Sequence, residues 1–184
     1  MDENRKRTIR RRPVLSAFGG LALGSVLAGC GSSGETGTLS TSVSDQPGDI
    51  GDFDSLLIQI NGIRVKPEDE DLQQLDADAE VDLTELVGEA SAIVDESDLE
   101  TGTYEFLQLE AEATEATLAD GGSADVSLPG DAPLKFNKAF EIRSGQTTSF
   151  IADFTPVKQG QTNRYVLQPV ADEVKVSYET QTEA

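Results

Sequence analysis

The sequence predicts an all-β protein, a single antiparallel β-sandwich of immunoglobulin-like or prealbumin-like type, with at most one short helix and a signal helix before it. Most segments after residue 37 alternate apolar and polar residues with period two, which is typical of strands that bury one face. Turn-forming clusters separate these segments, among them QPGD at 46–49, PGDAP at 129–133 and KQGQ at 158–161. Short strands at this spacing indicate two sheets packed face to face.

The alternation is clearest in LLIQI at 56–60, TYEFLQLEAEA at 103–113, TSFIADF at 148–154, and YVLQPV and EVKVSY near the end. In the first of these segments Leu56, Ile58 and Ile60 share one face, and in the third Phe150 and Phe154 do so. We expect these apolar faces to form the core.

Two segments allow more than one interpretation. Asn61-Gly62 lies between two apolar runs, which favours a hairpin turn, but the change of face between Ile60 and Ile63 favours a bulge in one long strand. The segment DLTELVG at 82–88 begins with a capping residue and ends in glycine, so it is expected to form one helical turn or none.

The only long apolar run, Val14 to Gly29, is 16 residues long and rich in Gly and Ser. A membrane-spanning helix needs about 20 apolar residues. The run has instead a basic start, an apolar middle and an end of small residues, so residues 1–29 are predicted to be a signal peptide.

The end of this run, Leu27-Ala28-Gly29-Cys30, looks like a lipobox, whose cysteine receives a lipid and becomes the new N-terminus. Arg11-Arg12 in its basic start looks like a twin-arginine export signal, although general secretion remains an alternative. We therefore expect the protein to pass through the export machinery and to be anchored outside the cell membrane by lipid on Cys30. The alternative is a plain N-terminal anchor with Cys30 unmodified.

The rest of the chain divides into three parts. Residues 30–37 are predicted to be a flexible tether, 38–178 the β-sandwich domain and 179–184 a polar tail.

The chain is strongly acidic, with a formal charge of -20 and no histidine. From Cys30 onward it carries 8 Lys and Arg against 32 Asp and Glu. Molar salt reduces the Debye length to about 3 Å and so screens the repulsion within such a domain. The composition indicates a halophile's surface, with a cation site or a basic partner as the alternative. It argues against nucleic acid, because phosphate contacts need Lys and Arg.

Several phrases occur in an order that resembles the DUF4382 family, a domain of unknown function in envelope lipoproteins of haloarchaea and bacteria. They are SDQP at 44–47, LLIQINGIRVKP, VDLTELVG, TGTYEFLQLEAE, a VSLP strand, FEIRSGQTTSFIADFTP and YVLQPVADEV. The resemblance implies a β-sandwich in the cell envelope and brings no activity, ligand or catalytic residue. Gln46 stands where the family's first motif, T-D-A-P, has alanine, and Asp45 is retained.

No catalytic residue is predicted. The absence of histidine excludes the usual Ser/His and Cys/His nucleophile systems, and Cys30 is assigned to the lipid. No phosphate-binding G-x-x-x-x-G-K-[ST] motif is present. We therefore expect a non-catalytic binding or structural module, with no cofactor besides the lipid. The alternative is a small carboxylate-dependent hydrolase, or an accessory subunit of an envelope enzyme or transport complex.

The one cluster that suggests a metal ion is DQPGDIGDFD. Asp45, Asp49, Asp52 and Asp54 could supply oxygen ligands for calcium from a flexible loop. Their spacing is not that of an EF-hand, and an acidic turn solvated by salt explains the same residues. Calcium is therefore the weaker expectation, and no metal site is predicted.

Overall fold

The computed structural model describes residues 34–130, 132–170 and 174–180, and strands make up most of these residues. In order, the elements are β1 (Thr36–Asp45), η1 (Asp49–Asp52), β2 (Phe53–Pro67), β3 (Gln73–Leu75), β4 (Ala79–Asp82), η2 (Leu83–Leu86), β5 (Ala92–Glu100), β6 (Gly102–Leu118), β7 (Asp125–Ser127), β8 (Leu134–Phe136), β9 (Phe140–Ile142), β10 (Gln146–Lys158), β11 (Arg164–Pro169) and β12 (Lys175–Thr180). In this described part, no helix is long and apolar enough to cross a membrane.

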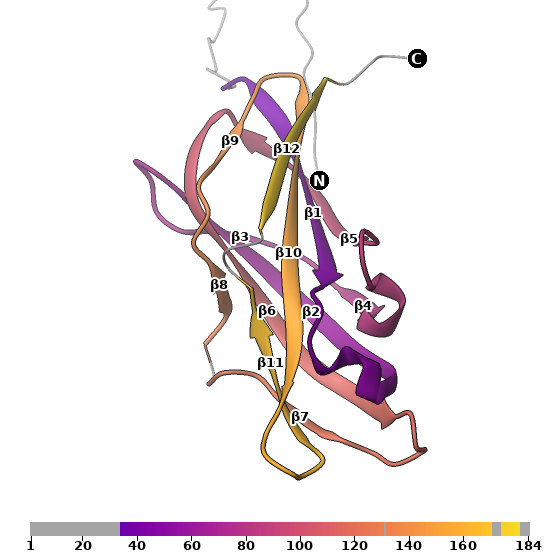
Figure 1. The fold of residues 1–184 in the computed structure, drawn as a ribbon. Coiled ribbons are helices and arrows are strands. Elements are labelled where there is room, and N and C mark those ends of the chain that lie inside the picture. The colour runs from indigo at the N-terminus through magenta and orange to yellow at the C-terminus, as the bar shows by residue number, and fades with distance from the viewer. Residues whose placement is uncertain (1–33, 131, 171–173, 181–184) are drawn as a thin grey trace, which may run out of the picture. The chain divides into compact units, whose positions relative to one another are not determined.

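The strands form two sheets, which confirms the predicted β-sandwich (Figure 1). Sheet A has the order β5-β1-β10-β11-β7, and β12 pairs with the first half of β10. Sheet B has the order β3-β2-β6-β8, with β4 on β2 and β9 on β6. The long strands β2 and β6 pair in the middle of sheet B, and the long strands β1 and β10 pair in the middle of sheet A.

Two pairings in sheet A are parallel, which corrects the expectation of a purely antiparallel sandwich. Strand β1 runs parallel to β10, with Ser44 opposite Asp153 and Asp45 opposite Phe154, and β7 runs parallel to β11. A parallel pair needs a crossover connection, and here all of sheet B lies between β1 and β10 in the sequence. Period-two alternation does not reveal that β1 and β10 are parallel, because side chains alternate in the same way in parallel and antiparallel strands.

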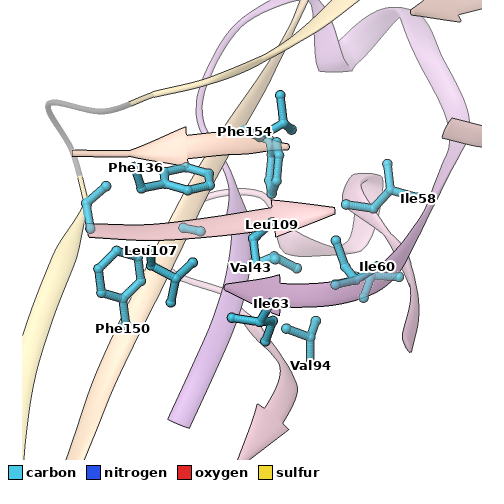
Figure 2. Close-up of a cluster of buried hydrophobic side chains, with 14 of the residues drawn as sticks. Val43, Ile58, Ile60, Ile63, Val94, Leu107, Leu109, Phe136, Phe150 and Phe154 are labelled. Carbon is cyan, nitrogen blue, oxygen red and sulfur yellow. The ribbon is translucent and has the colours of Figure 1, made fainter. Parts of the chain in front are cut away.

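The core lies between the sheets and consists of the positions that alternation predicts. Leu56, Ile58 and Ile60 have no exposed surface, and neither do Phe150 and Phe154. Figure 2 shows side chains of both sheets meeting in this cluster. Full burial of each such side chain stabilises the fold by about 1.5–3 kcal/mol.

Asn61 and Gly62 form a bulge and not a hairpin. Strand β2 continues through them, and its pairing with β6 shifts register between Ile60 and Gly62. Because of this shift Ile60 and Ile63 are both fully buried. A Cβ atom at Gly62 would lie 3.2 Å from a carboxylate oxygen of Glu110, so the bulge brings that carboxylate close to the backbone.

The short helical turn predicted within 82–88 is present as η2. The Asp82 carboxylate caps it by accepting hydrogen bonds from the backbone N–H of Thr84 at 3.0 Å and from its hydroxyl at 2.7 Å. A second turn of this kind, η1, corrects the expectation of at most one short helix. It forms because Ile50 turns inward and is buried while the acidic residues around it stay near the surface.

Candidate functional site

The four predicted calcium candidates do not converge. Asp45 ends β1 and is fully buried, Asp49 and Asp52 lie in η1, and Asp54 is exposed in β2. Asp49 accepts a hydrogen bond from the backbone N–H of Lys158 at 2.7 Å, so it faces β10. Within the residues described, no group of three or more His, Cys, Asp or Glu side chains is placed to hold a metal.

Asp52 belongs to a cluster with Lys158 and Tyr165 beside a hollow of about 230 Å³. Its Oδ2 atom accepts hydrogen bonds from Lys158 Nζ at 2.8 Å and from the Tyr165 hydroxyl at 2.7 Å. The Lys158 bond, followed by the Tyr165 bond, lowers the pKa of Asp52, and the bond to Asp52 raises the pKa of Lys158. A lysine that keeps its proton is a poor nucleophile or base. The cluster therefore ties η1 to the β10–β11 hairpin.

Two buried tyrosines, Tyr104 and Tyr165, each have a hydrogen-bond partner for the hydroxyl group. Tyr165 bonds to Asp52, and the Tyr104 hydroxyl donates to the backbone oxygen of Glu100 at 3.0 Å. Tyr104 also lines a hollow of about 280 Å³ together with Glu100 and the acidic residues 68–70. Burial, then the charges of Glu70 and Glu100, raise the pKa of Tyr104. The residues that line this hollow include no Lys or Arg, so it is a negatively charged surface.

Asp45 is the most unusual carboxylate in the described residues. It has no exposed surface, and neither of its side-chain oxygens has a hydrogen-bond partner. Alternation along β1 places it on the same face as Val43, which is in the core. Burial, and secondly the charge of Asp153, raise the pKa of Asp45 from 3.8 to about 7. A carboxyl group in this setting holds a proton near neutral pH.

Asp153, which sequence analysis did not single out, is its acidic neighbour. Asp153 is fully buried in β10 and accepts hydrogen bonds from the Ser44 hydroxyl and, at 3.3 Å, from the Gln46 side-chain amide. Ser44 and Gln46 flank Asp45, so the SDQP motif supplies both the orphan carboxyl group and two donors for Asp153. A polar Asp inside the apolar FIADF segment was the available signal.

A further hollow, of about 500 Å³, lies on the outer face of sheet B, and we call it the sheet-B hollow. Its floor contains Asn61 of the bulge and the ion pair of Arg64 and Glu110. Leu128 and Pro133, from the link between β7 and β8, form an apolar wall. The hollow thus lies beside the bulge, and its lining contains an amide, a guanidinium group and carboxylates.

The predicted export and lipidation residues lie outside the described residues. They are Arg11, Arg12, Leu27, Ala28, Gly29 and Cys30. They stay predictions from the sequence.

The described part of the chain is thus a two-sheet β-sandwich with a buried acidic pair and solvent-facing hollows. The chain belongs to the family described as "Domain of unknown function (DUF4382)", whose profile it matches over residues 36–169. This match confirms the resemblance seen in the ordered phrases. No curated protein and no solved structure matches the chain.

Proposed function

We propose that this protein is an exported, lipid-anchored component of the cell envelope whose β-sandwich is a non-catalytic binding or structural module. The observation that carries the proposal is Leu27-Ala28-Gly29-Cys30 at the end of an apolar run with a basic start. Strand β1 begins at Thr36, so five residues separate Cys30 from the first strand. A lipid on Cys30 would hold the domain close to the membrane surface.

The composition of the domain supports a high-salt setting. Salt bridges in the described part are few and most are exposed, such as Lys158–Asp52 at 2.8 Å and Arg164–Asp125 at 3.7 Å. Exposed pairs of this kind contribute little stability. The excess of carboxylates is therefore best balanced by mobile cations in the surrounding brine.

The alternative, a carboxylate-dependent hydrolase, draws on one observation, the raised pKa of Asp45 beside Asp153. A general acid has to reach within hydrogen-bond distance of its substrate. Asp45 and Asp153 are both fully buried, and neither lines the hollows described above. We therefore favour the non-catalytic module.

The test is to replace Cys30 with serine in the full chain, expressed in a salt-loving host. Cys30→Ser is expected to move the protein from the membrane pellet to the soluble fraction, and mass spectrometry of the wild type is expected to find lipid on Cys30. Ser32→Ala serves as the matched control. If Cys30→Ser remains as firmly membrane-bound as the wild type, the lipoprotein assignment is wrong. Lysines in place of Arg11 and Arg12 then separate the two export routes, because only twin-arginine export requires the arginine pair.

A further inference from the structure

The sheet-B hollow has the size and position of a ligand site. Its volume of about 500 Å³ lies within the range of about 300–1,000 Å³ that is typical of small-molecule sites. Arg64 and Glu110 in its floor alternate along their strands with the buried Ile63 and Leu109, so they lie on the face of sheet B opposite the core. The residues of its lining that carry the argument are Asn61, Arg64, Glu110, Glu112, Leu128 and Pro133.

The bulge shapes one side of the hollow. Asn61 is exposed there, and its side-chain amide donates to Glu112 Oε1 at 3.1 Å. Gly62 has no side chain, and the Glu110 carboxylate occupies the space where a Cβ would crowd it. Bulges commonly re-aim a side chain beside a functional site. Here the irregularity presents one amide and two carboxylates to the same hollow.

The ion pair in the floor leaves hydrogen-bonding capacity unused. Arg64 Nη2 contacts the buried Oε1 atom of Glu110, so this oxygen is already taken by the ion pair. The two charges are therefore neutralised, and the capacity that remains lies on the guanidinium group. A guanidinium group has five N–H donors, of which one carboxylate contact uses only part. Donors and acceptors thus stand side by side, next to the apolar wall of Leu128 and Pro133.

Charge decides which class of ligand suits this lining. An anion would have to approach a chain of formal charge -20, and Arg64 is already paired with Glu110. A cation would be repelled by the Arg64 guanidinium in the floor. It would be better placed in the hollow around Tyr104, whose lining has carboxylates and no basic residue. A neutral hydroxylated molecule fits better, because each hydroxyl group both donates and accepts. Its C–H surface would pack against Leu128 and Pro133.

We propose that the sheet-B hollow is a binding site for a neutral carbohydrate, such as one or two residues of a glycan chain. The inference rests on the proposed function, because an exported domain faces the glycans outside the membrane. Arg64 donates to ring hydroxyls, Glu112 accepts from them, and Asn61 holds Glu112 in place. The site orients a sugar and has no part in breaking it.

The experiment uses the full chain carrying Cys30→Ser in molar KCl, without sugar-based detergent. The probes are maltotriose, cellotriose, chitotriose and mannotriose, with trigalacturonate as the anionic comparison. Binding is detected by saturation-transfer NMR and measured by calorimetry. We expect at least one neutral trisaccharide to bind at millimolar concentration. Asn61→Ala combined with Glu112→Gln is expected to weaken binding about tenfold, since hydrogen bonds to the sugar are lost or misplaced.

Glu96→Gln in β5 of sheet A removes the same charge away from the hollow and is the matched control, expected to bind like the parent. Asn61 and Glu112 are exposed, and circular dichroism verifies that the variants fold; each single substitution replaces the double variant if it does not. The inference is overturned if no neutral trisaccharide binds, if only trigalacturonate binds, or if the hollow variants bind like Glu96→Gln. Cell fractionation of Cys30→Ser tests the lipid anchor separately, so the two failures are distinguishable.

Discussion

Replacing Asp45 with asparagine is expected to stabilise the protein at neutral and alkaline pH. The wild-type carboxyl group is fully buried and has no hydrogen-bond partner, so its ionised form is strongly disfavoured in the folded chain. Asparagine has nearly the same shape and cannot ionise. The substitution therefore removes the cost of the charge while leaving the packing around Val43 almost unchanged.

The sign and the size follow from proton linkage. The pKa of Asp45 is raised from 3.8 to about 7 on folding, so the folded state retains a proton that the unfolded state has already released. The contribution of the Asp45 carboxyl group to stability is therefore fully present below pH 3.8 and is lost as the pH rises toward 7. The loss reaches up to about 4 kcal/mol above pH 7. Asp45→Asn should match the wild type in acid and exceed it by up to that amount at pH 8.

Urea unfolding followed by circular dichroism, in constant molar KCl between about pH 4 and 8, measures this difference. Comparing two chains at each pH cancels the contributions of the other carboxylates. Asp54→Asn removes one exposed carboxylate from the same stretch and controls for the change in net charge. A wild-type-to-Asp45→Asn difference that does not vary with pH would refute the reasoning. So would an Asp45→Asn chain less stable than the wild type at pH 8, which would mean that the ionised carboxylate has a partner.

Three other outcomes follow from single contacts and from the overall charge. Gly37→Ala should destabilise the fold by about 1–3 kcal/mol or more, because its Cβ would lie 2.2 Å from the backbone oxygen of Arg143. Gly51→Ala, with nothing within 4 Å, is its control, and equal urea midpoints for the two would contradict the packing. Asp82→Ala should cost about 0.5–2 kcal/mol at neutral pH, because burial raises the pKa of Asp82 but hydrogen bonds from Thr84, Leu56 and Ser55 lower it further. That contribution is present above the unfolded carboxyl pKa and is lost as the pH falls through the folded value, so urea midpoints that differ equally at all pH values would argue against it. The melting temperature should rise from dilute buffer to molar KCl, since salt screens a charge of -20; an unchanged temperature would count against a halophilic surface.

The parts of the fold that depend on neighbours in sequence could be predicted. Alternation in LLIQI and FIADF identified the buried faces, and the change of face between Ile60 and Ile63 indicated the bulge. The η2 turn was predictable from its capping residue, Asp82, because the cap acts within two residues. In each case the physical cause is local, so a short window of sequence contains it.

The parts that depend on distant partners could not be predicted. Nothing near Asp45 in the sequence shows that Asp153 lies one register position away on a parallel strand. Asp45 was grouped with Asp49 and Asp52 because they are close in sequence, but Lys158 of β10 draws those two away. Extending the Leu39–Val43 period by two residues would have placed Asp45 on the core face. Alternation does not show, however, that the buried Asp45 carboxyl group has no hydrogen-bond donor beside it.

The parallel pairing of β1 with β10 also has a mechanical consequence. Strand β1 lies between β5 and β10, so it is paired along both edges from Thr38 to Val43. A pull on the chain ahead of Thr36 acts along β1, and it would have to shear both ladders at once. Peeling an edge strand would break the bonds one at a time. Strand β1, the first strand of the domain, is therefore expected to resist a pulling force from its N-terminal side.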